Sequence, residues 1–123
     1  MAWYCKAAER GSAHAQFSLG LRYDAGNGVL QDAAKAFSWY RRAAEQGHAR
    51  AEFNLGTMYA EGHGTDADPV QAWAWLELAA NHGMPQAMRA RTLLGQRMTA
   101  AQRSDAAALA QQRQHKPAGE SVA

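Results

Sequence analysis

The amino-acid sequence repeats itself every 36 residues, and this internal repeat constrains the fold more than any other feature. No insertion or deletion is needed to keep the register. The residues that recur in phase include Trp3, Trp39 and Trp75, then Gly11, Gly47 and Gly83, and then Ala15, Ala51 and Ala87. A period of about 20 to 50 residues is typical of solenoids, in which each unit buries its apolar face against its neighbours. The sequence therefore predicts an all-α fold, an α/α superhelical solenoid of antiparallel helix pairs.

Each unit has the pattern of two helices separated by a loop that contains glycine. In the first full unit, Ala15, Leu19 and Tyr23 are spaced by four residues and share one helical face. Gly26 is placed to end this helix, because glycine accepts the left-handed backbone of a helix C-terminus. Asp32 is placed to cap the second helix.

Later units keep this plan and add clearer start signals. Asp68 is the expected N-cap of a helix, Pro69 takes its first position, and Gln71 is placed to bond back to the cap. Further along, Thr99 and Gln102 have the spacing of a capping box at the start of a final helix.

Two glycines, Gly20 and Gly56, lie inside predicted helices. Glycine costs about 1 kcal/mol relative to alanine at such a position. A residue this unfavourable usually lets another helix approach closely. We expect Trp39 and Trp75, on the following helices, to pack against these glycines, which would make Trp39 a core residue.

One motif in the first full unit connects the sequence to a known family. It starts at Ala15 as Ala-x-Phe-x-Leu-Gly-x-x-Tyr-x-x-Gly-x-Gly, continues with Asp32, and ends as Trp-Tyr-x-x-Ala-Ala-Glu-x-Gly from Trp39 to Gly47. This pattern resembles the Sel-1-like repeat, a relative of the tetratricopeptide repeat. The resemblance covers residues 1 to about 96. It implies a superhelical adaptor of protein complexes, of a kind common in bacterial signalling, envelope and secretion-linked systems and found in eukaryotic protein quality control.

The repeat also predicts how the chain is divided. Arg91 and Thr92 stand where the other units have Leu-Gly, and Gly95 stands where they have tyrosine, so the last unit is degenerate. Residues 115–123 contain proline, glycine and few apolar side chains, and we expect them to be disordered. The predicted parts of a single domain over residues 1–114 are a partial unit at 1–12, full units at about 13–48 and 49–84, and a degenerate cap at 85–114.

The first helix of each unit has a second face, which points away from the core positions at 100° per residue. The resemblance implies that first helices line a concave groove. These positions vary between units whereas the core positions do not, so we predict that a protein or peptide partner binds this face without catalysis. A solvated helix face is the alternative. The predicted partner-binding residues are His14, Ser18, Leu21, Arg50, Asn54, Thr57, Glu61, Gln86, Leu93 and Arg97.

One loop offers an alternative function of another class. Glu61, His63, Asp66 and Asp68 cluster there and could supply oxygen and nitrogen ligands to a metal-dependent protein or an enzyme. The first unit keeps only Asp32 of these four at the equivalent positions. We therefore expect no metal, no cofactor and no enzymatic activity.

Charge is distributed unevenly along the chain. Residues 84–123 carry a formal charge of +4 and residues 1–83 carry −2. The arginine-rich C-terminal part could bind an acidic partner or nucleic acid. Most of the aromatic residues recur at the repeat period, as core residues do, so we expect no nucleic-acid partner.

The N-terminal residues 1–10 match only the second half of a unit, so the aromatic face of Trp3 and Tyr4 lacks its usual cover. We predict self-association through this helix or a longer protein upstream. Cys5 is the only cysteine, and we expect a structural thiol. No run of about 18 apolar residues is present, so we expect no membrane span. No signal peptide is visible, which favours the cytoplasm, whereas a removed signal would allow the periplasm.

Overall fold

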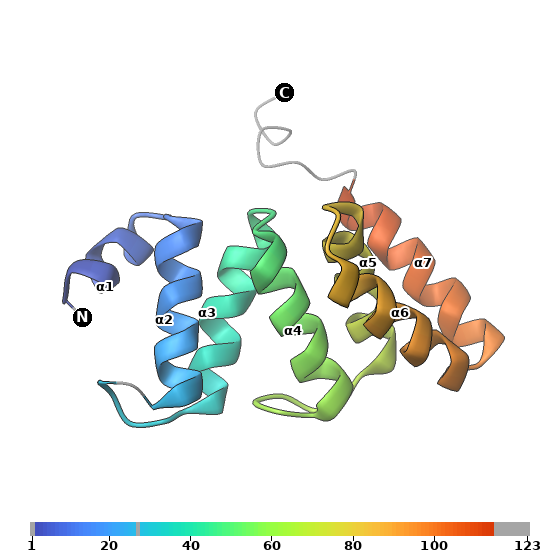
Figure 1. The fold of residues 1–123 in the computed structure, drawn as a ribbon, viewed down its shortest axis with the longest axis horizontal. Coiled ribbons are helices and arrows are strands. Elements are labelled where there is room, and N and C mark those ends of the chain that lie inside the picture. The colour runs from blue at the N-terminus through green and yellow to red at the C-terminus, as the bar shows by residue number, and fades with distance from the viewer. Residues whose placement is uncertain (1, 27, 115–123) are drawn as a thin grey trace.

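The computed structural model describes the backbone of residues 2–26 and 28–114 and the side chains of residues 6–26 and 28–113. Within these residues the chain forms helices only, and they stand in a curved row from the N-terminus to the C-terminus (Figure 1). The helices are α1 (Ala2–Glu9), α2 (Ala13–Ala25), α3 (Ala33–Glu45), α4 (Ala49–Glu61), α5 (Pro69–Asn81), α6 (Pro85–Arg97) and α7 (Ala100–Gln114).

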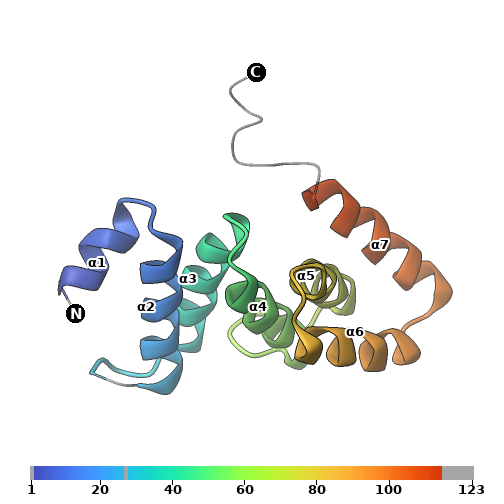
Figure 2. The ribbon, with the colours of Figure 1, turned by 45° about the horizontal axis from the view of Figure 1, so that its top comes forward.

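The helices pack in sequence order, as a solenoid requires. Helix α2 packs on α3 and α4 packs on α5, while α3 joins the first pair to α4 and α5 joins the second pair to α6. The view in Figure 2 confirms that these helices lie side by side. The predicted α/α solenoid is therefore confirmed. Among the described residues, no helix is both long and apolar enough to cross a membrane.

Equivalent residues begin and end the helices of the two full units. The side chain of Asp32 accepts a hydrogen bond from a backbone N–H at the start of α3, and Asp68 does the same for α5. Gly26 and Gly62 end α2 and α4 with φ values of 71° and 70°, in the left-handed region where glycine is favoured. These predicted caps are confirmed. The predicted bond from Gln71 back to the Asp68 cap was wrong: Gln71 Oε1 accepts from Arg113 Nη2 at 2.7 Å, and Asp68 N donates to the Tyr59 carbonyl at 2.9 Å.

The close-approach glycines have different partners from those we predicted. A Cβ on Gly20 would lie 2.5 Å from ring carbons of Tyr40, and a Cβ on Gly56 would lie 2.9 Å from Leu76 Cγ. Tyr40 is fully buried, whereas Trp39 is only half-buried. The placement of Trp39 beside Gly20 was wrong, because the next residue along the helix, Tyr40, lies at the glycine. Trp39 packs instead against the buried cluster of Ala8, Ala15 and Leu19.

The loop of the second unit packs against the first unit. A Cβ on Gly64 would lie 2.5 Å from the carbonyl oxygen of Ala33, at the start of α3. Gly28 occupies the same repeat position, and among the described residues a Cβ there would come within 4 Å of Arg22 Nη1 alone, at 3.6 Å. The glycine in the second unit therefore makes a close backbone contact between units.

The last helix leaves the repeat register. The connection between α6 and α7 is two residues long, and its capping box is confirmed: Gln102 N donates to Thr99 Oγ1 at 3.1 Å and Thr99 N donates to Gln102 Oε1 at 2.9 Å. Helix α7 then packs on α5.

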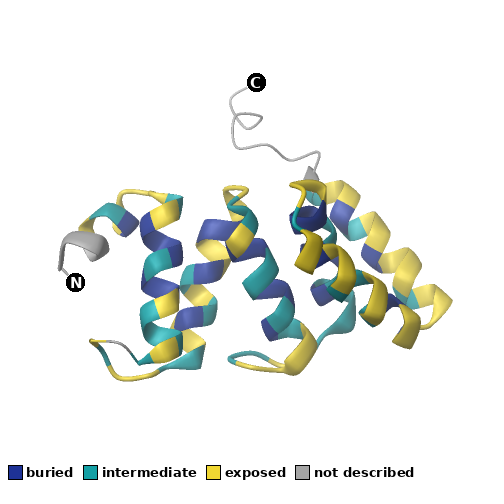
Figure 3. Ribbon diagram, viewed as in Figure 1, coloured by how far each residue is buried: buried dark blue, intermediate teal, exposed yellow. Residues whose placement is uncertain are grey.

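Figure 3 shows that α6 and α7 are mostly exposed, whereas buried residues are frequent along α2, α3, α4 and α5. The division of the chain into these units stays a prediction.

Three predictions lie outside the described residues. The disorder expected at residues 115–123 falls there. The side chains of Trp3, Tyr4 and Cys5 also fall there, so the predicted self-association and the structural thiol stay predictions.

Candidate protein-binding surface

The predicted partner-binding residues lie on α2, α4 and α6, and none of them is buried. Leu21 and Leu93 expose 42% and 63% of their surface, although leucine is usually buried in a core. We call these ten residues the first-helix stripe. Its exposed members are His14, Leu21, Arg50, Glu61, Gln86, Leu93 and Arg97, and its half-buried members are Ser18, Asn54 and Thr57.

An aromatic and cationic cluster forms where α2 meets α4. The rings of His14 and His48 stack with centroids 6.2 Å apart, and His48 stacks on Phe17 at 4.7 Å. The Arg50 guanidinium lies 5.4 Å from the centroid of the Phe17 ring. His48 thus joins the stripe residue His14 to Phe17, and the stripe residue Arg50 of the next unit lies over the same Phe17 ring. His48 was not singled out from the sequence.

The position of His48 in the repeat was the signal that would have found it. Ser12 stands 36 residues earlier and caps α2, while His48 Nδ1 accepts a hydrogen bond from Ala51 N at 3.2 Å and caps α4. Burial lowers the pKa of His48, and the charges of His14 and Arg50 lower it further. The ring is therefore held neutral, with Nδ1 as the acceptor.

Asn54 differs from the other stripe residues, because it also supports the core. The Tyr40 hydroxyl donates to Asp24 Oδ2 at 3.4 Å, and the Asn54 side chain lies near enough to lower the pKa of that hydroxyl. Burial raises the pKa of Tyr40, and the Asp24 charge raises it further. The phenol thus stays neutral, and Asn54 is a poor choice for testing the surface.

The alternative metal site does not assemble in the part of the chain that the structure describes. His63 Nε2 lies 3.1 Å from Asp24 Oδ1, on the preceding unit, and Asp68 Oδ1 accepts from Gln71 N at 3.2 Å. No group of three or more His, Cys, Asp and Glu side chains gathers as metal ligands among the described residues. His63 and Asp68 instead join units and start a helix.

Two buried polar residues occupy one repeat position and have different neighbours. Gln16 Nε2 donates to the Ala8 carbonyl at 2.9 Å, and Gln16 Oε1 accepts from Gln46 Nε2 at 2.8 Å. Glu52 replaces this glutamine in the next unit, and among the described residues its Oε1 has no hydrogen-bond partner. His82 Nε2 lies 3.4 Å from that oxygen, close enough for an ion pair but without hydrogen-bond geometry. Burial raises the pKa of Glu52 to about 8.

Known protein families account for this architecture. The Sel1 repeat model matches residues 1–12, 13–48 and 49–84, which is more than half of the chain. The chain belongs to the Sel1 repeat family. Proteins of this family are generally protein-interaction scaffolds, and the fold is typically non-catalytic. No curated protein matches the chain.

Two solved structures have the same Sel1 repeat fold. The first is a protective antigen present in uropathogenic Escherichia coli strains, described as having an SLR fold; it is 40% identical, with a TM-score of 0.90. The match covers 97% of this chain and 26% of the antigen. The second is a Sel1 repeat protein from Oxalobacter formigenes, 46% identical with a TM-score of 0.73, and the match covers 75% of this chain and 38% of that protein. The chain thus spans about a quarter to two fifths of the length of these relatives.

Proposed function

We propose that this Sel1 repeat protein is a scaffold that binds a protein or peptide partner on the first-helix stripe. The observation that carries the proposal is the exposure of large apolar side chains, Leu21 and Leu93, among polar residues at equivalent positions of successive units. Single exposed apolar residues are common on protein surfaces, so the proposal depends on the recurrence of leucine at one repeat position of the stripe, at Leu21 and Leu93.

The units supply the rigidity that such a surface needs. Tyr40 and Leu76 fill the space beside the close-approach glycines, and the Gly64 loop contacts the backbone of the preceding unit. These contacts fix each first helix relative to the next, so little conformational entropy is lost when a partner binds. The proposal needs no catalytic group.

Affinity capture from the source cells tests this function when it is run with matched variants. A triple variant, Leu21→Asp, Arg50→Glu and Leu93→Asp, places acidic groups along the stripe. We expect the partner captured by the wild type to be lost, while circular dichroism shows unchanged helix content.

The control variant changes the charge by the same amount on second helices. Ala34→Asp, Arg41→Glu and Asn81→Asp are exposed positions of α3 and α5. We expect this variant to capture the partner as the wild type does. Equal loss in both variants would argue against the stripe as the binding surface.

A further inference from the structure

A shallow cavity with a wide opening lies on the surface between α5, α6 and α7, where the repeat pattern would have placed a second helix against α6. Helix α3 begins at Ala33 and α5 begins at Pro69, so the repeat would start the next second helix near residue 105. Helix α7 begins instead at Ala100, after the short connection, and it packs on α5. The face of α6 that a second helix would normally cover is therefore left open.

Exposure along α6 supports this view. Thr92 occupies the repeat position of Gly20 and Gly56, which are buried, yet Thr92 is exposed. Met88 occupies the position of Gln16 and is 42% exposed, whereas Gln16 is 2% exposed. By helical spacing this open face lies opposite the first-helix stripe on α6.

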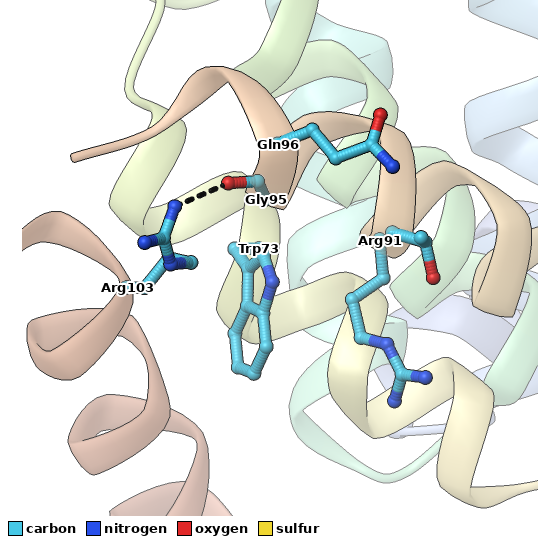
Figure 4. A pocket seen from close by; sticks show the side chains of 6 residues that line it. Trp73, Arg91, Gly95, Gln96 and Arg103 are labelled. Carbon is cyan, nitrogen blue, oxygen red and sulfur yellow. Dashed lines mark hydrogen bonds between the residues drawn. The ribbon is translucent and has the colours of Figure 1, made fainter. Parts of the chain in front are cut away.

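The cavity between α5, α6 and α7 has a volume of about 360 Å³. In Figure 4 the indole of Trp73 lies between the side chains of Arg103 and Arg91. The cavity is lined by Trp73, Arg91, Thr92, Gly95, Gln96 and Arg103.

Both arginines are anchored beside the indole. Arg103 Nη1 donates to the carbonyl oxygens of Gly95 and Met98 at 2.8 and 2.6 Å, and Arg91 Nη1 forms an ion pair with Glu77. A guanidinium has five N–H donors in a planar fork. The bonds to Gly95 and Met98 or to Glu77 use only some of these donors, so others remain to bind a ligand. An anchored fork binds a carboxylate with little loss of side-chain entropy.

The charge beside Trp73 favours an acidic ligand. Arg91 and Arg103 line the cavity, and Glu77 on α5 pairs with Arg91, so these three side chains leave a net charge of +1. In the other units a tyrosine or a leucine from the following helix fills the equivalent space. An aromatic side chain next to carboxylates would therefore match both the shape and the charge of the open face.

We propose that this cavity binds an acidic segment of a partner protein, with an aromatic side chain against Trp73 and carboxylates on Arg91 and Arg103. The site is separate from the first-helix stripe, so either surface can fail a test without the other. A nucleic-acid ligand is the competing possibility for a cationic surface, and the experiment includes it.

Fluorescence anisotropy with labelled peptides tests the proposal on the full chain at low ionic strength. The probe is a peptide of alternating aspartate and glutamate with one central phenylalanine. Matched probes replace the phenylalanine by alanine, or the acidic residues by their amides, and a single-stranded oligonucleotide is the fourth. We expect binding of the first probe to exceed that of the other three by at least about fivefold and to weaken with salt.

Variants assign the binding to the cavity. Thr92→Tyr fills it from an exposed position without changing charge, and Arg103→Gln removes one fork; each should weaken binding of the first probe by about tenfold. Arg97→Gln removes the same charge outside the cavity, and Leu21→Asp changes the stripe, so both should bind as the wild type does. Arg103 also anchors α7, so Arg103→Gln could lower the helix content seen by circular dichroism. In that case the binding of the first probe to Thr92→Tyr is the test of the cavity.

Three results would overturn the proposal. These are no binding of the acidic aromatic peptide, equal loss with Arg97→Gln and Thr92→Tyr, and tighter binding of the oligonucleotide than of the peptide.

Discussion

The units at 13–48 and 49–84 have helices of the same length and share the caps Asp32/Asp68 and Gly26/Gly62, but residues at equivalent positions have different surroundings. A Cβ on Gly28 would approach, among the described residues, a side-chain nitrogen of Arg22, whereas a Cβ on Gly64 would approach the backbone of the preceding unit. Both polar atoms of the Gln16 side chain form hydrogen bonds, whereas among the described residues Glu52 Oε1 is buried without a hydrogen-bond partner. The neighbours of a unit thus decide what a repeat position contributes to stability, and equal residues at equal positions are not interchangeable.

The largest expected effect is at the close-approach contact of the first unit. Tyr40→Ala removes a fully buried ring beside Gly20, and we expect a loss of about 3–5 kcal/mol in the free energy of unfolding. Trp39→Ala should cost less, because Trp39 is half-buried. Trp75→Ala should lower the free energy of unfolding more than Trp39→Ala does. The Trp75 side chain is 3% exposed, and the centroid of its ring lies 4.2 Å from the Arg113 guanidinium carbon. Urea unfolding of the three variants measures this order, and equal losses at Trp39 and Trp75 would mean that neighbours do not matter.

A smaller difference is expected between the two loop glycines. Gly28→Ala and Gly64→Ala both place a Cβ at positive φ, which costs about 1–2 kcal/mol. Gly64→Ala must also displace the Ala33 carbonyl, and we expect about 1–3 kcal/mol of further loss. Thermal unfolding of both variants gives the comparison. A Gly64→Ala protein as stable as Gly28→Ala would show that the contact between units yields easily.

The buried polar position should make stability depend on pH. The pKa of Glu52 is raised from 4.5 to about 8, so between these values the unfolded chain has lost a proton that the folded chain keeps. Stability is therefore lost as pH rises through this window. Glu52→Gln should flatten this dependence and stabilise the protein above pH 8 by about 1–3 kcal/mol.

The reverse change in the first unit is the matched control. Gln16→Glu should introduce the same loss with rising pH, because the carboxylate cannot donate to the Ala8 carbonyl as the amide does. Denaturant unfolding across the pH range measures both. A Glu52→Gln protein that keeps the wild-type slope would exclude Glu52 as its origin.

The smallest effect is expected at the cap of α4. The pKa of His48 is lowered, so below its ordinary value of 6.5 the unfolded chain takes up a proton that the folded ring resists. Stability should fall as pH drops through this range. His48→Ser gives α4 the same N-cap residue that α2 has in Ser12. It should keep the cap, since serine is a strong N-cap. As the pH drops, the free energy of unfolding of this variant should fall by about 0.5–1 kcal/mol less than that of the wild type. A variant with the same acid dependence as the wild type would place the titration elsewhere.

Local signals in the sequence were sufficient to predict the helices and their ends. Asp32, Gly26 and the Thr99–Gln102 pair act through neighbours a few residues away, so their spacing determines their role. Tyr40 could not be told from Trp39 in this way. Both recur beside each other on one helix, and the crossing angle of two helices decides which of them meets Gly20.

Longer-range features were only partly predictable. The early start of α7 was visible as a short connection, but its packing on α5 depends on the direction in which the chain leaves α6. The different surroundings of Gln16 and Glu52 arise from the ends of other helices, where Gln46 in one unit is replaced by His82 in the next. The stripe was predicted from periodicity, and His48, which joins His14 to Phe17, lay outside that pattern.

Site-specific photocrosslinking in the source cells tests the central claim most directly. A photoreactive amino acid is placed at Leu21 or Glu61 on the stripe, and at Ser38 on the exposed side of α3 as the control. A scaffold that binds through the stripe should give one discrete crosslinked protein from the first two positions and none from the third. Equal crosslinking from Ser38, or no crosslink from either stripe position, would contradict the proposed binding surface.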